Sequence, residues 1–143
     1  MATPQKSLEV LVVDDEESIR NLLSTIITRL GDNPTKAIDG QDGIDKYVTA
    51  LANNKPFDVV ITDLKMPNKS GVDVIKEVKV LTPYIPVYVI TGKEATAEYA
   101  WLVAQLGDLT PDGVLQKPFS PDTIKNLLEP IRQRKYENPP SQS

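Results

Sequence analysis

The chain alternates five times between a short apolar run and a longer segment in which apolar residues recur every three or four positions. The apolar runs lie at residues 8–13, 35–38, 57–62, 86–90 and 113–116, and the second is the weakest. Such runs are typical of strands, and the three-and-four spacing is typical of amphipathic helices. Repeated strand-then-helix units need crossover connections, which place helices on both faces of a parallel sheet. The alternation therefore predicts an α/β fold, a doubly wound five-stranded parallel sheet.

The helical segments lie at residues 19–30, 44–51, 74–81, 94–106 and 120–131. The last begins with a typical start signal, because Ser120 can act as N-cap with Pro121 at the first helical position. The fourth contains the only tryptophan, Trp101. An aromatic residue on an amphipathic helix usually packs in the core, and we expect this of Trp101. The alternative is that Trp101, Tyr99 and Leu102 form a contact surface for another protein.

A length of 143 residues suits one domain with a single core. We place this domain at residues 8–134. Residues 1–7 are polar, and residues 135–143 are polar with two adjacent prolines. We therefore expect a disordered N-terminus, and a disordered tail or linker stump at the C-terminus. No segment has the length of a membrane span or the pattern of a secretion signal, so we expect a cytoplasmic protein without membrane contact.

The composition excludes several kinds of chemistry. The chain has no cysteine and no histidine. This rules out disulfides, metal sites built from thiolates or imidazoles, Ser-His-Asp catalysis, and a phosphohistidine on this chain. The 16 basic and 20 acidic residues give a net charge of -4 without a basic block, so direct nucleic-acid binding is not expected. The available chemistry comes from carboxylates, hydroxyls, lysines and the backbone.

Polar residues directly follow four of the five predicted strands. They are Asp14 and Asp15 after the first, Asp63 after the third, Thr91 after the fourth and Lys117 after the fifth. In a doubly wound sheet, ligands bind outside the carboxyl ends of the strands. We therefore expect three carboxylates, one hydroxyl and one ammonium group in a shallow pocket. Each residue alone has an ordinary explanation as a helix start or turn, but their coincidence at four strand ends favours a site.

Three carboxylates in one pocket repel each other, because two like charges about 4 Å apart cost on the order of 4 kcal/mol at an effective dielectric of about 20. Mg2+, or Mn2+ in its place, neutralises such a cluster, since these cations prefer oxygen ligands and take few carboxylates from a protein. Lys117 supplies a second compensating charge. A metal beside an exposed carboxylate, with a lysine and a threonine to hold oxygens, suits phosphoryl transfer onto that carboxylate.

These residues resemble the receiver domain of two-component response regulators, including single-domain chemotaxis regulators. Asp14 and Asp15 are similar to the acidic pair of that family. Residues 63–67, Asp-Leu-Lys-Met-Pro, with Gly71 following, resemble its phosphoacceptor loop, and residues 117–119, Lys-Pro-Phe, resemble its lysine motif. The resemblance implies the flavodoxin-like strand order 2-1-3-4-5, and a cis peptide bond within the lysine motif.

The resemblance also implies a role for each site residue. Asp63 would accept a phosphoryl group from the phosphohistidine of a sensor histidine kinase or a histidine phosphotransfer protein. Mg2+ would be held directly by Asp15, Asp63 and the backbone carbonyl of Lys65, and through water by Asp14. The phosphoryl oxygens would be held by Thr91, Lys117 and the backbone amides of Leu64 and Gly92. The domain would be a signalling switch rather than an enzyme, catalysing only its own phosphorylation and dephosphorylation. Phosphorylation would change its surface, so that the domain binds an unknown output protein or forms a dimer through the face from the fourth to the fifth helix.

Two features depart from the family pattern. Val114 occupies a position that is usually aromatic, and the link at residues 107–112 is longer than usual. The first departure leaves open an alternative function, a receiver fold that binds proteins without phosphorylation. A phosphatase with an aspartyl nucleophile is a poor match, because Lys65 stands where such an enzyme needs its general acid.

Overall fold

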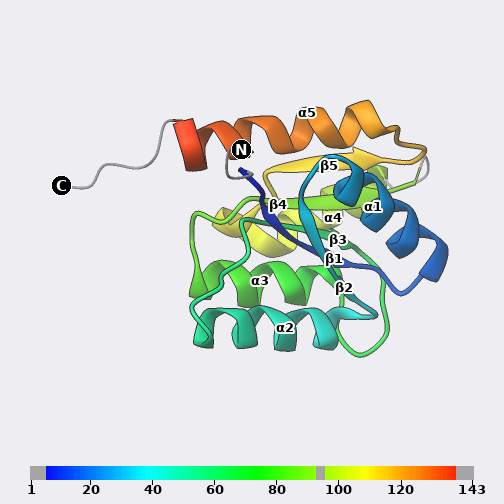
Figure 1. The fold of residues 1–143 in the computed structure, drawn as a ribbon. Coiled ribbons are helices and arrows are strands. Elements are labelled where there is room, and N and C mark those ends of the chain that lie inside the picture. The colour runs from blue at the N-terminus through cyan, green and yellow to red at the C-terminus, as the bar shows by residue number, and fades with distance from the viewer. Residues whose placement is uncertain (1–5, 93–95, 138–143) are drawn as a thin grey trace, which may run out of the picture.

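The computed structural model describes residues 6–92 and 96–137 and confirms the predicted doubly wound architecture. Five parallel strands form one sheet in the order β2-β1-β3-β4-β5 (Figure 1), which is the order that the resemblance implied. The strands are β1 (Glu9–Val13), β2 (Asn33–Ala37), β3 (Val59–Asp63), β4 (Val87–Thr91) and β5 (Gly113–Gln116).

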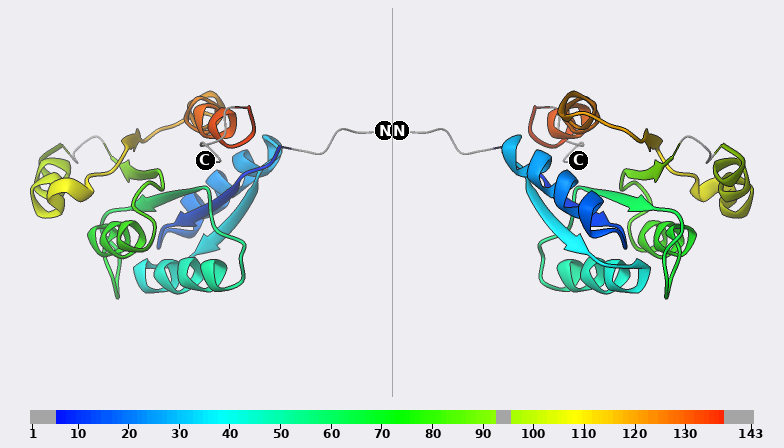
Figure 2. Two further views of the ribbon diagram at one scale, coloured as in Figure 1. Left: turned by 90° about the vertical axis from the view of Figure 1, so that its left-hand side faces the viewer. Right: turned by 90° about the vertical axis from the view of Figure 1, so that its right-hand side faces the viewer.

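Five helices cover the two faces of the sheet. They are α1 (Glu17–Arg29), α2 (Gly40–Ala52), α3 (Gly71–Leu81), α4 (Thr96–Leu106) and α5 (Pro121–Arg132). A 3-10 turn, η1 (Gly107–Leu109), precedes β5, and a π-helical turn, η2 (Gln133–Glu137), follows α5. Figures 1 and 2 show α1 and α5 on one face and α2 and α3 on the other. Within the described residues, no helix is both long enough and apolar enough to span a membrane.

The buried side chains form one apolar layer on each face of the sheet. Val10 and Val12 of β1 belong to the layer under α1 and α5, whereas Leu11 and Val13 belong to the layer under α2 and α3. Because helices cover both faces, the central strands are apolar throughout instead of alternating. The parallel direction brings the carboxyl ends of all strands to one edge, and this edge carries the polar residues predicted to form a site.

Strand β2 begins two residues earlier and ends one residue earlier than predicted. Asn33 pairs with Glu9, and Pro34 pairs with Val10. A proline is tolerated there because β2 is an edge strand, with one side outside the hydrogen-bonded ladder. Most of its residues are exposed or half-buried, so the apolar pattern that reveals a buried strand is weak.

The prediction that Trp101 lies in the core is wrong, because its side chain is 60% exposed. Ala97, Ala100 and Ala104 are also exposed and lie at three-and-four spacing around it. Helix α4 therefore presents an apolar stripe to solvent, and the alanines in its sequence do not distinguish an exposed face from a buried one. The side chains of Tyr99 and Leu102 lie outside the described part of the chain.

Helical structure continues beyond residue 134, where we placed the end of the domain. η2 reaches Glu137, and the Tyr136 hydroxyl donates to the Ser7 carbonyl oxygen at 2.5 Å. Lys135 donates from Nζ to Asp58 Oδ2 at 3.0 Å. These contacts join residues 129 and 77 positions apart, so the local sequence gave no sign of them. Residues 1–5 and 138–143 of the predicted disordered ends lie outside the described residues.

Candidate functional site

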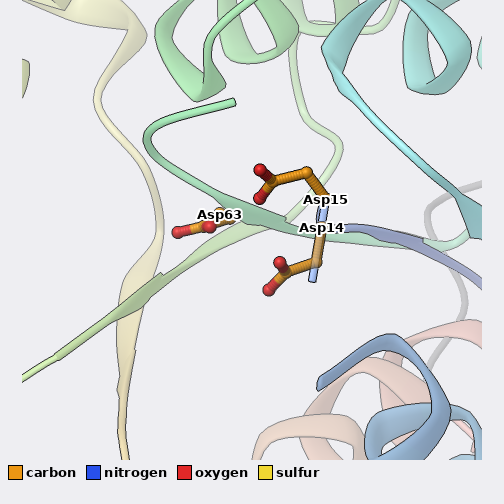
Figure 3. A group of neighbouring side chains, drawn as sticks. All are labelled: Asp14, Asp15 and Asp63. Atoms are coloured by element: carbon orange, nitrogen blue, oxygen red, sulfur yellow. The ribbon is translucent and has the colours of Figure 1, made fainter. Parts of the chain in front are cut away.

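Three carboxylates gather beyond the carboxyl ends of β1 and β3 (Figure 3). Asp14 and Asp15 follow β1 directly, and Asp63 is the last residue of β3. Each offers one carboxylate oxygen, and these three oxygens lie within 4.8 Å of one another. The two strands are neighbours in parallel register, with Val13 opposite Thr62. The sheet therefore brings together the three acids that the sequence placed at its strand ends.

Asp14 is fully buried and fixed from several sides. Its N–H donates to the Ala37 carbonyl oxygen of β2 at 3.2 Å, and its own carbonyl oxygen accepts from Arg20 Nη1 at 2.8 Å. Its Oδ1 accepts from the Glu16 N–H at 2.8 Å, whereas Oδ2 has no hydrogen-bond partner among the described residues. Burial raises the pKa of the Asp14 carboxyl to about 6, and the nearby charge of Asp63 raises it as well. The negative charge of an ionised Asp14 carboxylate is therefore not fully compensated by hydrogen bonds or by a nearby positive charge.

Asp63 is half-buried, and its Oδ1 accepts from the Leu64 N–H at 2.8 Å. Burial raises the pKa of its carboxyl, although the Leu64 N–H and the charge of Lys117 oppose this. The two ends of the loop that follows Asp63 lie close together, because the Gly71 N–H donates to the Leu64 carbonyl oxygen at 2.7 Å. A Cβ on Gly71 would lie 2.2 Å from the Asp63 carbonyl oxygen, so this close approach needs a glycine.

Thr91 and Lys117 complete the edge of the site. Thr91 is buried at the end of β4, and its carbonyl oxygen accepts from the Lys117 N–H at 2.8 Å. The Lys117–Pro118 peptide bond is cis, as the family resemblance implied. The charge of Lys117 lowers the pKa values of the Asp14 and Asp63 carboxyls, which places its ammonium group within electrostatic reach of both.

Sequence reasoning missed Glu16. Its Oε2 lies 3.8 Å from Lys117 Nζ, its charge raises the pKa of the Asp63 carboxyl, and its N–H is the partner of Asp14. Its position directly after the acidic pair could have indicated this role. Two other residues of the predicted site, Lys65 and Gly92, lie close in sequence to Asp63 and Thr91. Lys65 is exposed in the loop after Asp63, and Gly92 is exposed after β4.

Val114 lies on β5, and its side chain is 42% exposed. The position that departs from the family pattern is therefore on the surface, on the strand next to Thr91. The longer link at residues 107–112 contains η1 and ends at Asp112. Asp112 accepts from the buried Lys79 Nζ at 3.0 Å and from the Val87 N–H at 2.8 Å. This link is thus tied to α3 and to the start of β4.

The residues of this acidic cluster suit a small divalent cation. The three acids offer hard oxygen donors, Asp14 Oδ2 is buried without a hydrogen-bond partner among the described residues, and the pKa values of the Asp14 and Asp63 carboxyls are raised. A positive charge between the acids would give Asp14 Oδ2 a partner and lower the pKa values of the Asp14 and Asp63 carboxyls, which is the usual effect of a bound Mg2+ on its carboxylate ligands.

The fold and this cluster define a doubly wound α/β domain with an acidic site and a lysine at the carboxyl edge of its sheet. The family model of the response regulator receiver domain matches residues 10–129. The chain belongs to this family, whose standard function is a phosphorylation-based signalling switch.

Individual relatives cover nearly the whole chain. The chain is 35% identical to the chemotaxis protein CheY-3 of Vibrio cholerae over 133 residues, which are 90% of this chain and 95% of that protein. It is 28% identical to a chemotaxis protein CheY homolog of Campylobacter jejuni, covering 87% of this chain and 92% of that one. The solved structure of a response regulator receiver domain protein from Clostridium thermocellum has a TM-score of 0.74 at 26% identity, covering 90% of this chain and 96% of that one.

Proposed function

We propose that Asp63 accepts a phosphoryl group from a phosphohistidine of a partner protein. In this step an Asp63 carboxylate oxygen forms a bond to phosphorus while the phosphorus–nitrogen bond breaks, and the released imidazole takes up a proton. The observation that carries the proposal is the position of Asp63, half-buried, within 4.8 Å of two other carboxylates and within the electrostatic reach of Lys117.

The proposed cation is Mg2+, or Mn2+ in its place. Asp15, Asp63 and the backbone carbonyl of Lys65 would hold it directly, and Asp14 would hold it through water. When bound, such a cation neutralises the charge that develops on the transferred phosphoryl group. The partnerless Asp14 oxygen and the raised pKa of the Asp14 carboxyl support this assignment.

The oxygens of the transferred group need donors on the side away from the cation. We assign Thr91 and Lys117 to this role, together with the backbone amides of Leu64 and Gly92. The Leu64 N–H already points at Asp63 Oδ1, and Lys117 and Thr91 are joined through a backbone hydrogen bond. Donors held by the fold before reaction stabilise developing charge without reorganising, which is where most of the rate enhancement in such transfers originates.

The partners follow from the same chemistry. The chain has no histidine, and the phosphodonor that we propose is a sensor histidine kinase or a histidine phosphotransfer protein, which we place with this chain in the cytoplasm. Beyond this, the receiver would catalyse only its own phosphorylation and dephosphorylation. Phosphorylation would shift an equilibrium between two surface conformations and change the affinity for an output protein.

The test is intact mass after incubation with Mg2+ and acetyl phosphate. The parent protein is expected to gain the mass of one phosphoryl group, and Asp63→Ala is expected to gain none. Asp58→Ala is a matched control, because Asp58 lies just before β3 at the opposite edge of the sheet and should leave labelling intact. A parent that stays unlabelled, even with a phosphorylated histidine kinase, would instead support the alternative of a binding module that works without phosphorylation.

We place the output surface on the exposed stripe of α4, Ala97, Ala100, Trp101 and Ala104, and include the exposed Val114 of β5. A stripe of apolar side chains is suited to contact with another protein surface. The same stripe could pair two copies through the face from α4 to α5.

Phosphorylation is accordingly expected to change the emission of Trp101, the only tryptophan of the chain. Fluorescence before and after addition of acetyl phosphate with Mg2+ measures this, with Asp63→Ala as control. Sedimentation of the same samples distinguishes dimer formation from a change within one chain. Unchanged emission of a fully labelled protein would contradict the placement of the output surface on α4.

A further inference from the structure

The loop between β3 and α3, residues 64–70, is tied to the N-terminus of α2 by a side-chain hydrogen bond. Asn68 donates from Nδ2 to Asp39 Oδ2 at 2.8 Å. Asp39 is buried, and its other oxygen, Oδ1, accepts from the Asp42 N–H at 2.8 Å as the N-cap of α2. One oxygen of this carboxylate thus serves its own helix and the other holds the loop.

The backbone confirms that α2 and the loop are in close contact. A Cβ on Gly40 would lie 2.0 Å from the Lys69 carbonyl oxygen, so the first residue of α2 leaves no space between the two segments. Asn68 itself has a φ of 71°, a left-handed conformation that asparagine tolerates better than most residues. The chain reverses around it, because the Lys69 N–H donates to the Pro67 carbonyl oxygen at 2.8 Å.

The tied loop is the one that carries the proposed site. Asp63 immediately precedes it, and the carbonyl of Lys65, a proposed metal ligand, lies three residues before Asn68. The base of the loop is fixed by the buried Leu64 and by its hydrogen bond with Gly71. The middle of the loop is exposed at Pro67 and Asn68, and there the bond to Asp39 supplies an attachment to a second element.

We propose that Asp39 and Asn68 are positioning residues, whose hydrogen bond holds the loop so that the Lys65 carbonyl is in place for the cation. This inference rests on the proposed function, since it requires that carbonyl to be a ligand. A hydrogen bond to a buried side chain is poorly replaced by water, because water has little access to that side chain. Groups that orient metal ligands from outside the coordination sphere commonly control affinity in this way.

Three substitutions separate the bond from the structure around it. Asn68→Gly removes the amide but keeps a residue that readily adopts positive φ. Asp39→Ser keeps an N-cap oxygen for α2 but is too short to reach the loop. Asp39→Asn keeps both functions, because its carbonyl oxygen can cap the helix and its amide can donate to a rotated Asn68 side chain.

The readout is the affinity for Mg2+ alone, measured by calorimetric titration of the full chain. Asn68→Gly and Asp39→Ser are each expected to bind Mg2+ about tenfold more weakly than the parent. The Asp39→Asn variant is expected to bind with close to the parent affinity, and the double variant Asp39→Ser, Asn68→Gly no more weakly than either single one. Labelling by acetyl phosphate should be slow in both weakened variants at low Mg2+ and recover at saturating Mg2+.

Unfolding in the presence of a chelator shows that each variant is folded before it is titrated. Parental Mg2+ affinity in both Asn68→Gly and Asp39→Ser would overturn the inference, and so would an Asp39→Asn variant as weak as Asp39→Ser. If the parent itself neither binds Mg2+ nor becomes labelled, the proposed function fails, and this inference fails with it.

Discussion

Replacing Arg132 by methionine is expected to lower the free energy of unfolding by about 3–5 kcal/mol, because it leaves a buried carboxylate without its counter-charge. The Asp32 side chain is completely buried, and its two oxygens accept from the Arg132 guanidinium at 2.6 and 2.7 Å. Asp32 Oδ1 also accepts from the Leu8 N–H at 2.9 Å, at the entry to β1. Methionine preserves much of the apolar stem, so the loss reports mainly on the charge.

Urea unfolding of the purified variants measures this difference. Arg132→Lys should lose less than Arg132→Met, because lysine keeps the charge but lacks the two-pronged geometry of the guanidinium. Lys125→Met, at an exposed position of the same helix, is the matched control and should stay within about 0.5 kcal/mol of the parent. A loss below about 1 kcal/mol in Arg132→Met would show that Asp32 does not depend on this partner.

The candidate site could be predicted from the sequence because it depends on local pattern. Asp14 and Asp63 each end an apolar run, and parallel strands bring such ends to one edge whatever their separation along the chain. The strand order and the cis peptide bond at Pro118 followed from the family resemblance. Both are present in the structure.

The contacts that secure the site could not be predicted in this way. Arg132 and Asp32 lie 100 positions apart, and Asn68 and Asp39 lie 29 apart. No helical or strand period relates such residues, since their contact depends on how separate elements meet. The exposure of Trp101 escaped prediction for a related reason, because the alanines beside it do not distinguish a buried face from an exposed one.

Replacing Asp14 by asparagine is expected to raise the free energy of unfolding by about 2 kcal/mol at pH 8 without divalent cations. Burial raises the pKa of the Asp14 carboxyl from 3.8 to about 6, and such a difference corresponds to ~3 kcal/mol of destabilisation once the group is ionised. Asparagine keeps an oxygen for the Glu16 N–H and places an amide where Asp14 Oδ2 now has no hydrogen-bond partner among the described residues. The variant therefore loses the charge but keeps the hydrogen bond.

The sign of the pH dependence follows from the native pKa lying above the unfolded one. Between pH 6 and 3.8 the Asp14 carboxyl is protonated in the native state but still ionised in the unfolded state. Lowering the pH through this window therefore stabilises the parent protein, whereas Asp14→Asn has no such carboxyl and should not gain this stability. Urea unfolding with a chelator at pH 8 and pH 5 measures the difference, with Asp45→Asn on α2 as an exposed control. Equal pH dependence in parent and Asp14→Asn would contradict the argument. Because the same charge is proposed to attract Mg2+, the variant that is more stable without the cation should also gain less stability when it is added.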